Sequence, residues 1–311
     1  MMPLEQAGWN PSAFELLTAD VLAGPPGVAA FDFDNTLIRN DLGEAVMYYI
    51  LFQALLRADL PEFWEEIRHP ALNDADLAEL RRMWGGIETQ GGEDADEYMH
   101  FVDRLAPLYG QVYAHSGMAE AYRWSRVLFA FQGEKELRSI ARYVFGYEQN
   151  QPIGVTQLPS GLQIPRGIRV YREVHALIRA MLERGWDVRI VTASPQVLIQ
   201  AVITHWGIAE NRVHGMRLER GPHDLLLPRI VEPMPVQAGK VARLQTEVDG
   251  PLDFMIGDSI GDFELLRHAK RAILIDRGNA ELKAAAVEAG MIIQQPFPVA
   301  EEAPPDAAYF I

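Results

Sequence analysis

The sequence predicts an α/β fold with a Rossmann-like parallel sheet core and an inserted helical domain. Four short apolar runs, rich in β-branched or aromatic residues, have the length of strands: 27–33, 187–193, 253–258 and 271–276. Their apolarity is continuous rather than alternating, which is typical of strands covered on both faces in a parallel sheet. Between residue 41 and about residue 165 the patterns are helical instead. We therefore expect residues 1–40 and 166–311 to form the core and residues 41–165 a helical cap.

The first strand, in "GVAAFDFDNT", ends on two aspartates. Strand alternation places Asp32 and Asp34 on the same side and turns Phe33 into the packing. At the carboxyl edge of a parallel sheet both acids would enter the ligand-binding crevice, where their repulsion requires a nearby positive charge. Asp32 can attack a phosphorus atom, and Asp34 can exchange protons with the leaving oxygen and with water. A plain turn that uses Asp and Asn for turn chemistry is the alternative.

The insert contains four segments that look helical: 42–57, 94–109, 116–131 and 134–147. Its exit, residues 149–167, is rich in Pro and Gly and predicts a linker or a short hairpin. A further helix is predicted from Val170 to Leu182, closed by Gly185 in a left-handed cap. The acidic, Pro-rich tail from residue 294 onward predicts no regular element.

Three more places carry chemistry. Thr192 ends the second strand in "RIVTASP", where a hydroxyl and the following amides can bind phosphate oxygens, although helix capping would also explain it. Lys240 stands at the predicted start of a helix in "QAGKVARL". In "MIGDSIGDFELL" a third strand ends on Asp258 and Asp262. Four acids from two strand ends, with one backbone carbonyl, form the oxygen-rich shell that Mg²⁺ prefers.

The order DFDNT, hydroxyl at a strand end, GK and GDSxxD resembles the four motifs of the haloacid dehalogenase superfamily, and specifically its phosphatases. The resemblance implies that Asp32 is the nucleophile and Asp34 the general acid and base. It also implies that Thr192 and Lys240 hold the phosphate and that Asp258 is a magnesium ligand.

The same resemblance implies a metal site formed by Asp32, Asp34, Asp258 and Asp262, with Asp34 contributing its backbone carbonyl. Asp262 is either a direct ligand or a group that orients a bound water or Lys240, and both alternatives stay open. Thr36 supports the first loop in this pattern.

The position of the helical insert resembles subfamily I enzymes with a C1 cap, the branch of phosphoserine phosphatase and phosphorylcholine phosphatase. Asp41 falls where those enzymes place an acid facing the ammonium group of the substrate, so the resemblance implies a cationic leaving group. Ala193 and Ser194 replace two glycines that phosphoserine phosphatases carry beside the bound substrate, and Gly261 replaces an asparagine. These differences argue against phosphoserine itself as the substrate.

Aromatic residues and acids are concentrated in the insert. Rings and carboxylates together can form a cage for a choline-like cation, although rings at helical spacing more often form a core. The aromatic residues are Trp64, Trp84, Tyr98, Phe101, Tyr109, Tyr113, Tyr122 and Trp124, and the acids are Glu93, Asp94, Asp96 and Glu97. His100 and His115 are expected at the surface or in the core. An anionic headgroup would instead require one of four arginines: Arg81, Arg82, Arg123 or Arg126.

Composition excludes several classes of function. The formal charge of −15 argues against nucleic acid or an anionic membrane as a partner, and the absence of cysteine excludes a thiol nucleophile. No apolar run reaches the ~18 residues of a membrane span, so we expect a cytoplasmic enzyme. The predicted partner is a small phosphate ester, and oligomeric state is not predicted. A sugar phosphate, a phosphorylated natural-product intermediate and, against the complete acid set, a non-catalytic binding protein are the alternatives.

Overall fold

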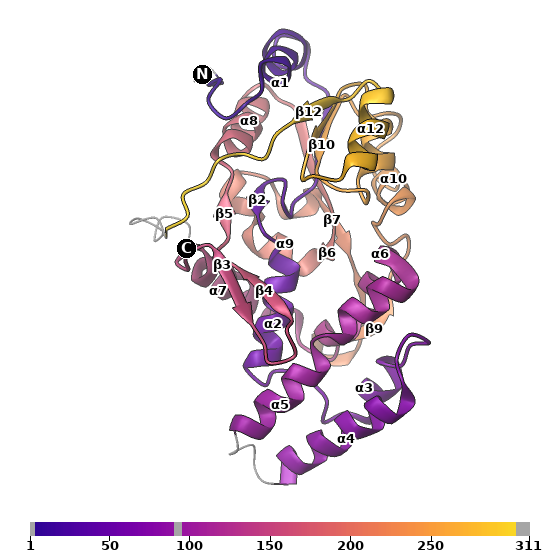
Figure 1. Ribbon diagram of the computed structural model, residues 1–311. Coiled ribbons are helices and arrows are strands. Elements are labelled where there is room, and N and C mark those ends of the chain that lie inside the picture. Colours follow the sequence, from indigo (N-terminus) through magenta and orange to yellow (C-terminus); the bar gives the residue numbers. More distant parts are fainter. Residues whose placement is uncertain (1–3, 90–94, 303–311) are drawn as a thin grey trace.

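The computed structural model describes residues 4–89 and 95–302 and has a six-stranded parallel sheet at its centre (Figure 1). The strand order is β12-β11-β10-β1-β6-β7, with every neighbouring pair parallel. The strands are β1 (Val28–Phe31), β6 (Asp187–Pro195), β7 (Val213–Met216), β10 (Phe254–Gly257), β11 (Ala272–Ile275) and β12 (Ile292–Gln294). The chain order reverses between β1 and β10, where open α/β sheets form their ligand crevice.

Both faces of the sheet are covered, as its continuous apolar strands predict. Ala29 and Phe31 of β1 pack into one core cluster, while Ala30 between them packs into the other. The first cluster contains side chains of α8 (Arg172–Glu183) and α9 (Gln196–Val202). The second contains side chains of α10 (Ala238–Gln245), α11 (Phe263–Arg267) and α12 (Ala280–Glu288). The predicted α/β fold with a parallel sheet core is confirmed.

The described part of the insert contains six helices, which lie between the short strands β2 (Ile38–Arg39) and β3 (Gly154–Gln157). Figure 1 shows α3, α4 and α5 at the end of the molecule farthest from α1. The six are α2 (Leu42–Phe52), α3 (Pro61–Glu66), α4 (Asp74–Thr89), α5 (Ala95–Leu105), α6 (Leu108–Phe129) and α7 (Glu134–Gln149). Two short strands, β2 (Ile38–Arg39) and β5 (Arg169–Val170), pair where the chain leaves and re-enters the core. This pairing lies close to the predicted cap boundaries at residues 41 and 165.

The remaining elements are short. The segment 149–167 forms a hairpin of β3 (Gly154–Gln157) and β4 (Gln163–Arg166), and a second hairpin joins β8 (Leu218–Arg220) to β9 (Leu226–Ile230). The chain begins with α1 (Pro11–Glu15) and a π-helical turn (Leu16–Val21). Three 3₁₀ turns are also present: Ile203–Trp206, Glu210–Arg212 and Pro222–Asp224. No helix of the described residues is long and apolar enough to span a bilayer.

Several elements differ from the sequence expectations. The four predicted strands are present, but β7, β12 and the β8–β9 hairpin were missed because they are short or interrupted by His, Gly and charged residues. Helix α2 ends at Phe52, five residues early, and Ala54 then adopts a left-handed φ of +53°. The predicted helix at 116–131 is the second part of α6, which Gly117 kinks at φ +82°. Gly185 has the predicted left-handed φ, +81°.

Trp206 joins the inserted helices to the strand that carries the two aspartates. It is 2% exposed, and its ring lies 5.5 Å from that of Phe33 and 6.0 Å from that of Phe145 on α7. Phe33 is fully buried, as the alternation predicts. The conformation of the loop after β1 therefore depends on packing that reaches into the insert.

We expect Trp206→Ala to lower the free energy of unfolding by about 3–5 kcal/mol, the usual effect of truncating a large buried aromatic side chain. Urea denaturation followed by far-UV circular dichroism measures the change. Val287→Ala, at a side chain that is 58% exposed, is the control and should shift stability by less than about 0.5 kcal/mol. Equal stability of the two variants would contradict this account of the core.

Candidate active site

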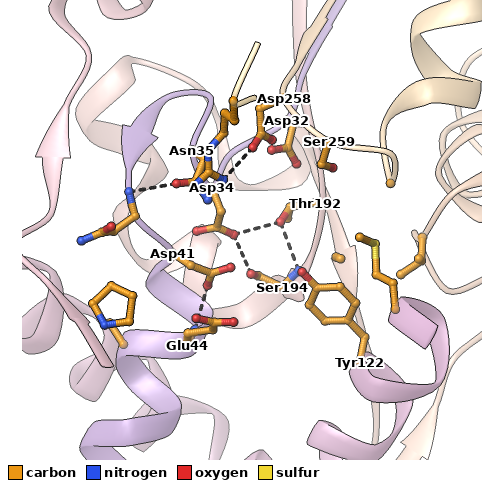
Figure 2. A pocket seen from close by; sticks show the side chains of 18 of the residues that line it. Asp32, Asp34, Asn35, Asp41, Glu44, Tyr122, Thr192, Ser194, Asp258 and Ser259 are labelled. Carbon is orange, nitrogen blue, oxygen red and sulfur yellow. Dashed lines mark hydrogen bonds and ion pairs between the residues drawn. The ribbon is translucent and has the colours of Figure 1, made fainter. Parts of the chain in front are cut away.

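The loop after β1 holds the two aspartates in a fixed arrangement (Figure 2). Asn35 adopts a left-handed φ of +58°, which Asn tolerates better than most residues. Its amide nitrogen donates to the carbonyl of Asn40 at 3.1 Å, and its side-chain oxygen accepts from the amide of Asn40 at 3.1 Å. Thr36 is fully buried and its hydroxyl donates to Asp32 Oδ2 at 3.2 Å. The predicted support of the loop by Thr36 agrees with this contact.

Lys240 lies between two aspartates from different elements. Its Nζ donates to Asp32 Oδ1 at 2.7 Å, to Asp262 Oδ1 at 2.5 Å and to the carbonyl of Val191 at 3.0 Å. Burial alone would lower the pKa of Lys240, but the carboxylates of Asp262 and Asp32 outweigh burial and raise it. Lys240 is the third residue of α10, at the predicted helix start, and stays charged at neutral pH.

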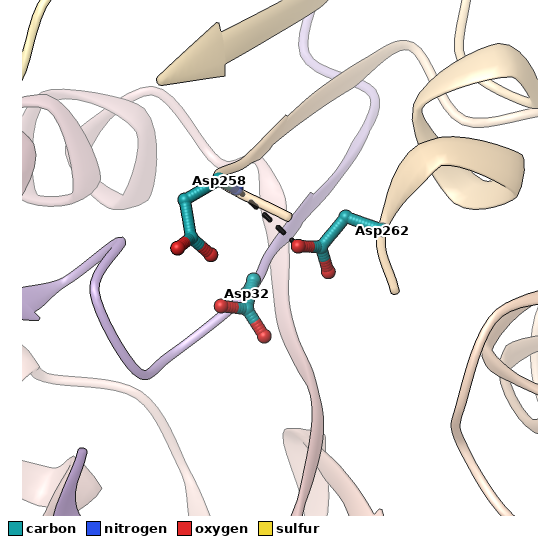
Figure 3. A group of neighbouring side chains, drawn as sticks. All are labelled: Asp32, Asp258 and Asp262. Atoms are coloured by element: carbon teal, nitrogen blue, oxygen red, sulfur yellow. Dashed lines mark hydrogen bonds between the residues drawn. The ribbon is translucent and has the colours of Figure 1, made fainter. Parts of the chain in front are cut away.

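Asp258, at the end of β10, completes a compact group of acids with Asp32 and Asp262 (Figure 3). One carboxylate oxygen from each lies within 4.8 Å of the others, and all three residues are buried. Burial, with Asp262 nearby, raises the pKa of Asp32 to about 7, and burial with Asp32 nearby raises that of Asp258 well above its ordinary value. Lys240 pairs with two of these carboxylates and Arg277 with Asp258, and a divalent cation fits among the three because it relieves the repulsion between them.

Asp262 has both carboxylate oxygens in use. Oδ1 accepts from Lys240, while Oδ2 accepts from the amide and the hydroxyl of Ser259 at 3.0 and 2.7 Å. Gly257 is required beside it, because a Cβ there would stand 2.7 Å from the Cβ of Asp262. These contacts suit a residue that orients Lys240 and the loop after β10.

Asp34 faces away from this acid group, toward β6. Its Oδ1 accepts from the amide of Leu42 at 2.8 Å, and its Oδ2 accepts from the hydroxyls of Ser194 at 2.6 Å and Thr192 at 3.4 Å. Burial, with Asp41 nearby, raises the pKa of Asp34 well above its ordinary value. The raised pKa favours the protonated form of Asp34, which is the form that a general acid uses.

Thr192 and Ser194 come from an irregular stretch of β6. Regular pairing with β7 stops at Val191, and the strand continues with shifted register to Pro195, two residues beyond the predicted end at residue 193. Both hydroxyls donate to Asp34, and Ala193 between them lines the cavity wall. Gly43 lets α2 approach here, because a Cβ would stand 2.7 Å from Ser194 Oγ.

A cavity of about 350 Å³ joins these groups to the inserted helices (Figure 2). Asp41 caps α2, accepting from the amide of Glu44 at 2.7 Å, and both acids line the cavity. Burial, with Glu44 nearby, raises the pKa of Asp41 to about 7, and burial with Asp34 nearby raises that of Glu44. Two acids held this close would favour an added positive charge.

The aromatic residues of the insert divide into two groups. Tyr109, Tyr113 and Tyr122 line the cavity. The other five form core, as the alternative interpretation predicts: Trp64, Trp84, Tyr98, Phe101 and Trp124. A core assignment for all eight rings would therefore have been wrong for three of them.

The other candidates of the insert do not line the cavity. His100 and His115 are exposed. Among the arginines, Arg123 pairs with Glu232 and Arg126 with Glu66, while Arg81 and Arg82 are exposed. The acids Asp96 and Glu97 lie outside the cavity wall, and Glu93 and Asp94 fall outside the described residues.

The cavity residues that sequence reasoning missed include Glu44, Tyr48, Ser259 and Arg277. Glu44 has a local signal, since it stands three residues after the cap residue Asp41, as in a capping box. Arg277, in the loop between β11 and α12, donates to Asp258 Oδ2 at 3.0 Å and has no motif of its own. Gly261 lines the cavity, and a Cβ there would stand 3.2 Å from Met118 Sδ.

Comparisons with known proteins agree with this geometry. The sequence profile described as haloacid dehalogenase-like hydrolase matches residues 114–267. The matched segment includes Thr192, Lys240, Asp258 and Asp262, but it does not include Asp32 or Asp34. Over this segment the chain is similar to haloacid dehalogenase-like hydrolases, and its parallel sheet has the α/β architecture described above. The search of curated proteins found no match.

Solved structures support the fold. A conserved protein of unknown function from Anaerococcus prevotii DSM 20548 is 22% identical with a TM-score of 0.78, covering 92% of both chains. A protein of unknown function from Bordetella pertussis Tohama I is 16% identical with a TM-score of 0.57, covering 88% of this chain and 100% of that one. A phosphoserine phosphohydrolase-like protein from Francisella tularensis is 13% identical with a TM-score of 0.43, covering 92% and 100%. The last likeness is too distant to bear on function.

The raised pKa of Asp41 predicts how stability depends on pH. Its pKa rises from 3.8 to about 7 on folding, so between these values the folded protein binds more protons than the unfolded chain. The free energy of unfolding should therefore fall as the pH rises from about 4 to 7, by at most ~1.4 kcal/mol per pH unit for this group. Asp41→Asn should flatten the slope, measured by urea denaturation in metal-free buffer across this range. Asp74→Asn, at an exposed helix start, is the control, and an unchanged slope in Asp41→Asn would contradict the assignment.

Proposed function

We propose that the protein is a Mg²⁺-dependent phosphomonoesterase that acts through an aspartyl-phosphate intermediate. The observation that carries the proposal is the pairing of Asp32 with Lys240 beside Asp34, which separate contacts hold and whose pKa burial raises. Asp32 is paired with an ammonium and is available for attack, whereas Asp34 accepts from hydroxyls and an amide and is placed to donate a proton. A non-catalytic protein would have no use for this division of roles.

The chain's own residues account for each step. An oxygen of Asp32 attacks phosphorus, and the ester oxygen leaves with the proton of Asp34. Asp34 then takes a proton from water as the water attacks the aspartyl phosphate, which releases phosphate and regenerates Asp32. Lys240 and the Thr192 hydroxyl hold phosphate oxygens during both transfers.

Asp32, Asp258 and the backbone carbonyl of Asp34 are proposed to hold the Mg²⁺ ion. When bound, the ion neutralises charge on the transferring phosphoryl group. Asp262 is proposed to act by orienting Lys240, because its oxygens are occupied by Lys240 and Ser259. A cytoplasmic location and the cap boundaries at residues 41 and 165 remain part of the proposal.

The proposed substrate is a small phosphate ester with an amine or quaternary ammonium in the leaving group, like phosphorylcholine or phosphoserine. Asp41 and Glu44 line the cavity beyond Asp34, and Tyr48, Tyr109 and Tyr122 supply ring faces nearby. Carboxylates and aromatic faces together attract an organic cation. The substitutions Ala193, Ser194 and Gly261 favour a phosphorylcholine-like ester over phosphoserine.

A second candidate rests on Arg277, a cation at the cavity wall that is 51% exposed. A guanidinium there would suit hydroxyl or anionic groups of a leaving alcohol. A sugar phosphate or a phosphorylated natural-product intermediate is therefore the alternative substrate.

Asp32→Asn should lower phosphate release by at least about 10³-fold without loss of fold, because the amide is not a nucleophile. The assay measures free phosphate from p-nitrophenyl phosphate with Mg²⁺, and EDTA should abolish the wild-type signal. Asp249→Asn, at an exposed loop position, should retain wild-type activity. Undiminished turnover by Asp32→Asn would refute the mechanism.

A panel of phosphate esters tests the leaving group. We expect phosphorylcholine and phosphoethanolamine to be hydrolysed with higher kcat/KM than glycerol phosphate or glucose 6-phosphate. Asp41→Asn should raise KM for the amine-bearing esters by about tenfold, as expected for losing a charge partner worth ~1.4 kcal/mol, and should change KM for glycerol phosphate much less. Equal loss across the panel would remove the proposed role of Asp41.

A further inference from the structure

A second cavity of about 190 Å³ lies beside the active-site cavity, between α2, α7 and β4. These elements lie next to one another in Figure 1. The two cavities share four lining residues, Ala45, Tyr48, Glu148 and Pro165. The second cavity, called the side groove below, therefore adjoins the active-site cavity, and Tyr48 belongs to the wall that the two share.

Aromatic rings dominate the side groove. The rings of Tyr143 and Tyr147 stack with an interplanar angle of 12° and centroids 6.0 Å apart, and Tyr49 lies 5.4 Å from Tyr143. Tyr143 is 55% exposed and Tyr147 42% exposed, so large ring surfaces face solvent. Tyr48 and Phe52 form a second stacked pair on α2, with centroids 6.5 Å apart. Such faces bind flat apolar groups by stacking.

The charges in the side groove are already neutralised. Glu148 and Arg166 are the charged residues that line it, and Arg166 Nε donates to Glu148 Oε1 at 2.8 Å. Glu148 Oε2 accepts from the amide of Gly167 at 2.8 Å, and the Arg166 guanidinium lies 5.5 Å from the Tyr147 ring centroid. The charges of the side groove are therefore paired with each other, whereas the carboxylates of Asp41 and Glu44 repel each other. The side groove suits an uncharged group better than a second ammonium or phosphate.

We propose that the side groove binds a planar aromatic or heteroaromatic ring at the far end of the leaving group. The order along the substrate is then phosphate at Lys240, ammonium at Asp41 and Glu44, and ring beyond Tyr48. This inference rests on the proposed function for its orientation. It narrows the substrate class to amine-bearing phosphate esters extended by an aromatic ring.

Phosphoethanolamine and its N-benzyl derivative test the inference, because they share phosphate and ammonium and differ in the ring. The wild-type enzyme should hydrolyse the benzyl ester with the higher kcat/KM. Tyr143→Ala and Tyr147→Ala should each reduce that preference about fivefold, the loss expected from one aromatic stacking partner. Val287→Ala, which lines neither cavity, should keep it. The absence of a wild-type preference, or its persistence in both tyrosine variants, would overturn the inference.

The binding of the free amino alcohols, measured by calorimetry, tests this inference independently of the proposed function. N-benzylethanolamine should bind the wild-type protein more tightly than ethanolamine, and Tyr143→Ala should weaken its Kd about fivefold. If this difference in binding is found but neither ester is hydrolysed, the proposed function is refuted and the inference that the side groove binds a ring is retained. If both amines bind alike, the side groove is refuted whether or not the esters are hydrolysed.

Discussion

Repulsion among the carboxylates at the ends of β1 and β10 is the constraint on which the site depends. Asp32, Asp258 and Asp262 are buried together, and the ammonium of Lys240 is the positive charge that pairs directly with two of them. Removing one partner from such a buried cluster usually costs about 3–5 kcal/mol, because the remaining charge is left unpaired. The fold meets this constraint by bringing α10 against the strand ends, so that one lysine reaches both acids.

The same repulsion is relieved differently at Asp32 and at Asp34. Asp32 is drawn toward Lys240, whereas Asp34 is held by two hydroxyls and an amide on the other side of the loop. Identical side chains two residues apart thus have different partners, an ammonium for Asp32 and neutral donors for Asp34, and are suited to different roles. The end of β6 makes this possible, since Thr192 and Ser194 are alternate residues of the strand and present both hydroxyls on the side of Asp34.

The inserted helices complete the cavity in a way that bears on substrate size. Helix α2 supplies Asp41 and Glu44 at its start and Tyr48 one turn further on, so one helix contributes groups to the cation region and to the side groove. Helix α7 and the β3–β4 hairpin close the side groove from the other side. A rigid α2, anchored by the cap at Asp41, would therefore set the spacing between ammonium and ring in any ligand that fills both.

The sequence by itself determined the parallel sheet, the helical insert and the catalytic pattern. Continuous apolar strands can be stable only between two covering layers, and Asp32, Asp34, Lys240 and Asp258 follow strand ends or helix starts that such a sheet brings together. The sequence did not predict short strands such as β7 and β12, because three or four residues are too few to show a clear hydrophobic pattern. Only the tertiary structure decided that Tyr109 and Tyr122 face the cavity while Trp84 and Trp124 are core, and that Arg277 reaches Asp258. Which face a helix turns inward depends on packing against distant segments, and local spacing does not contain that information.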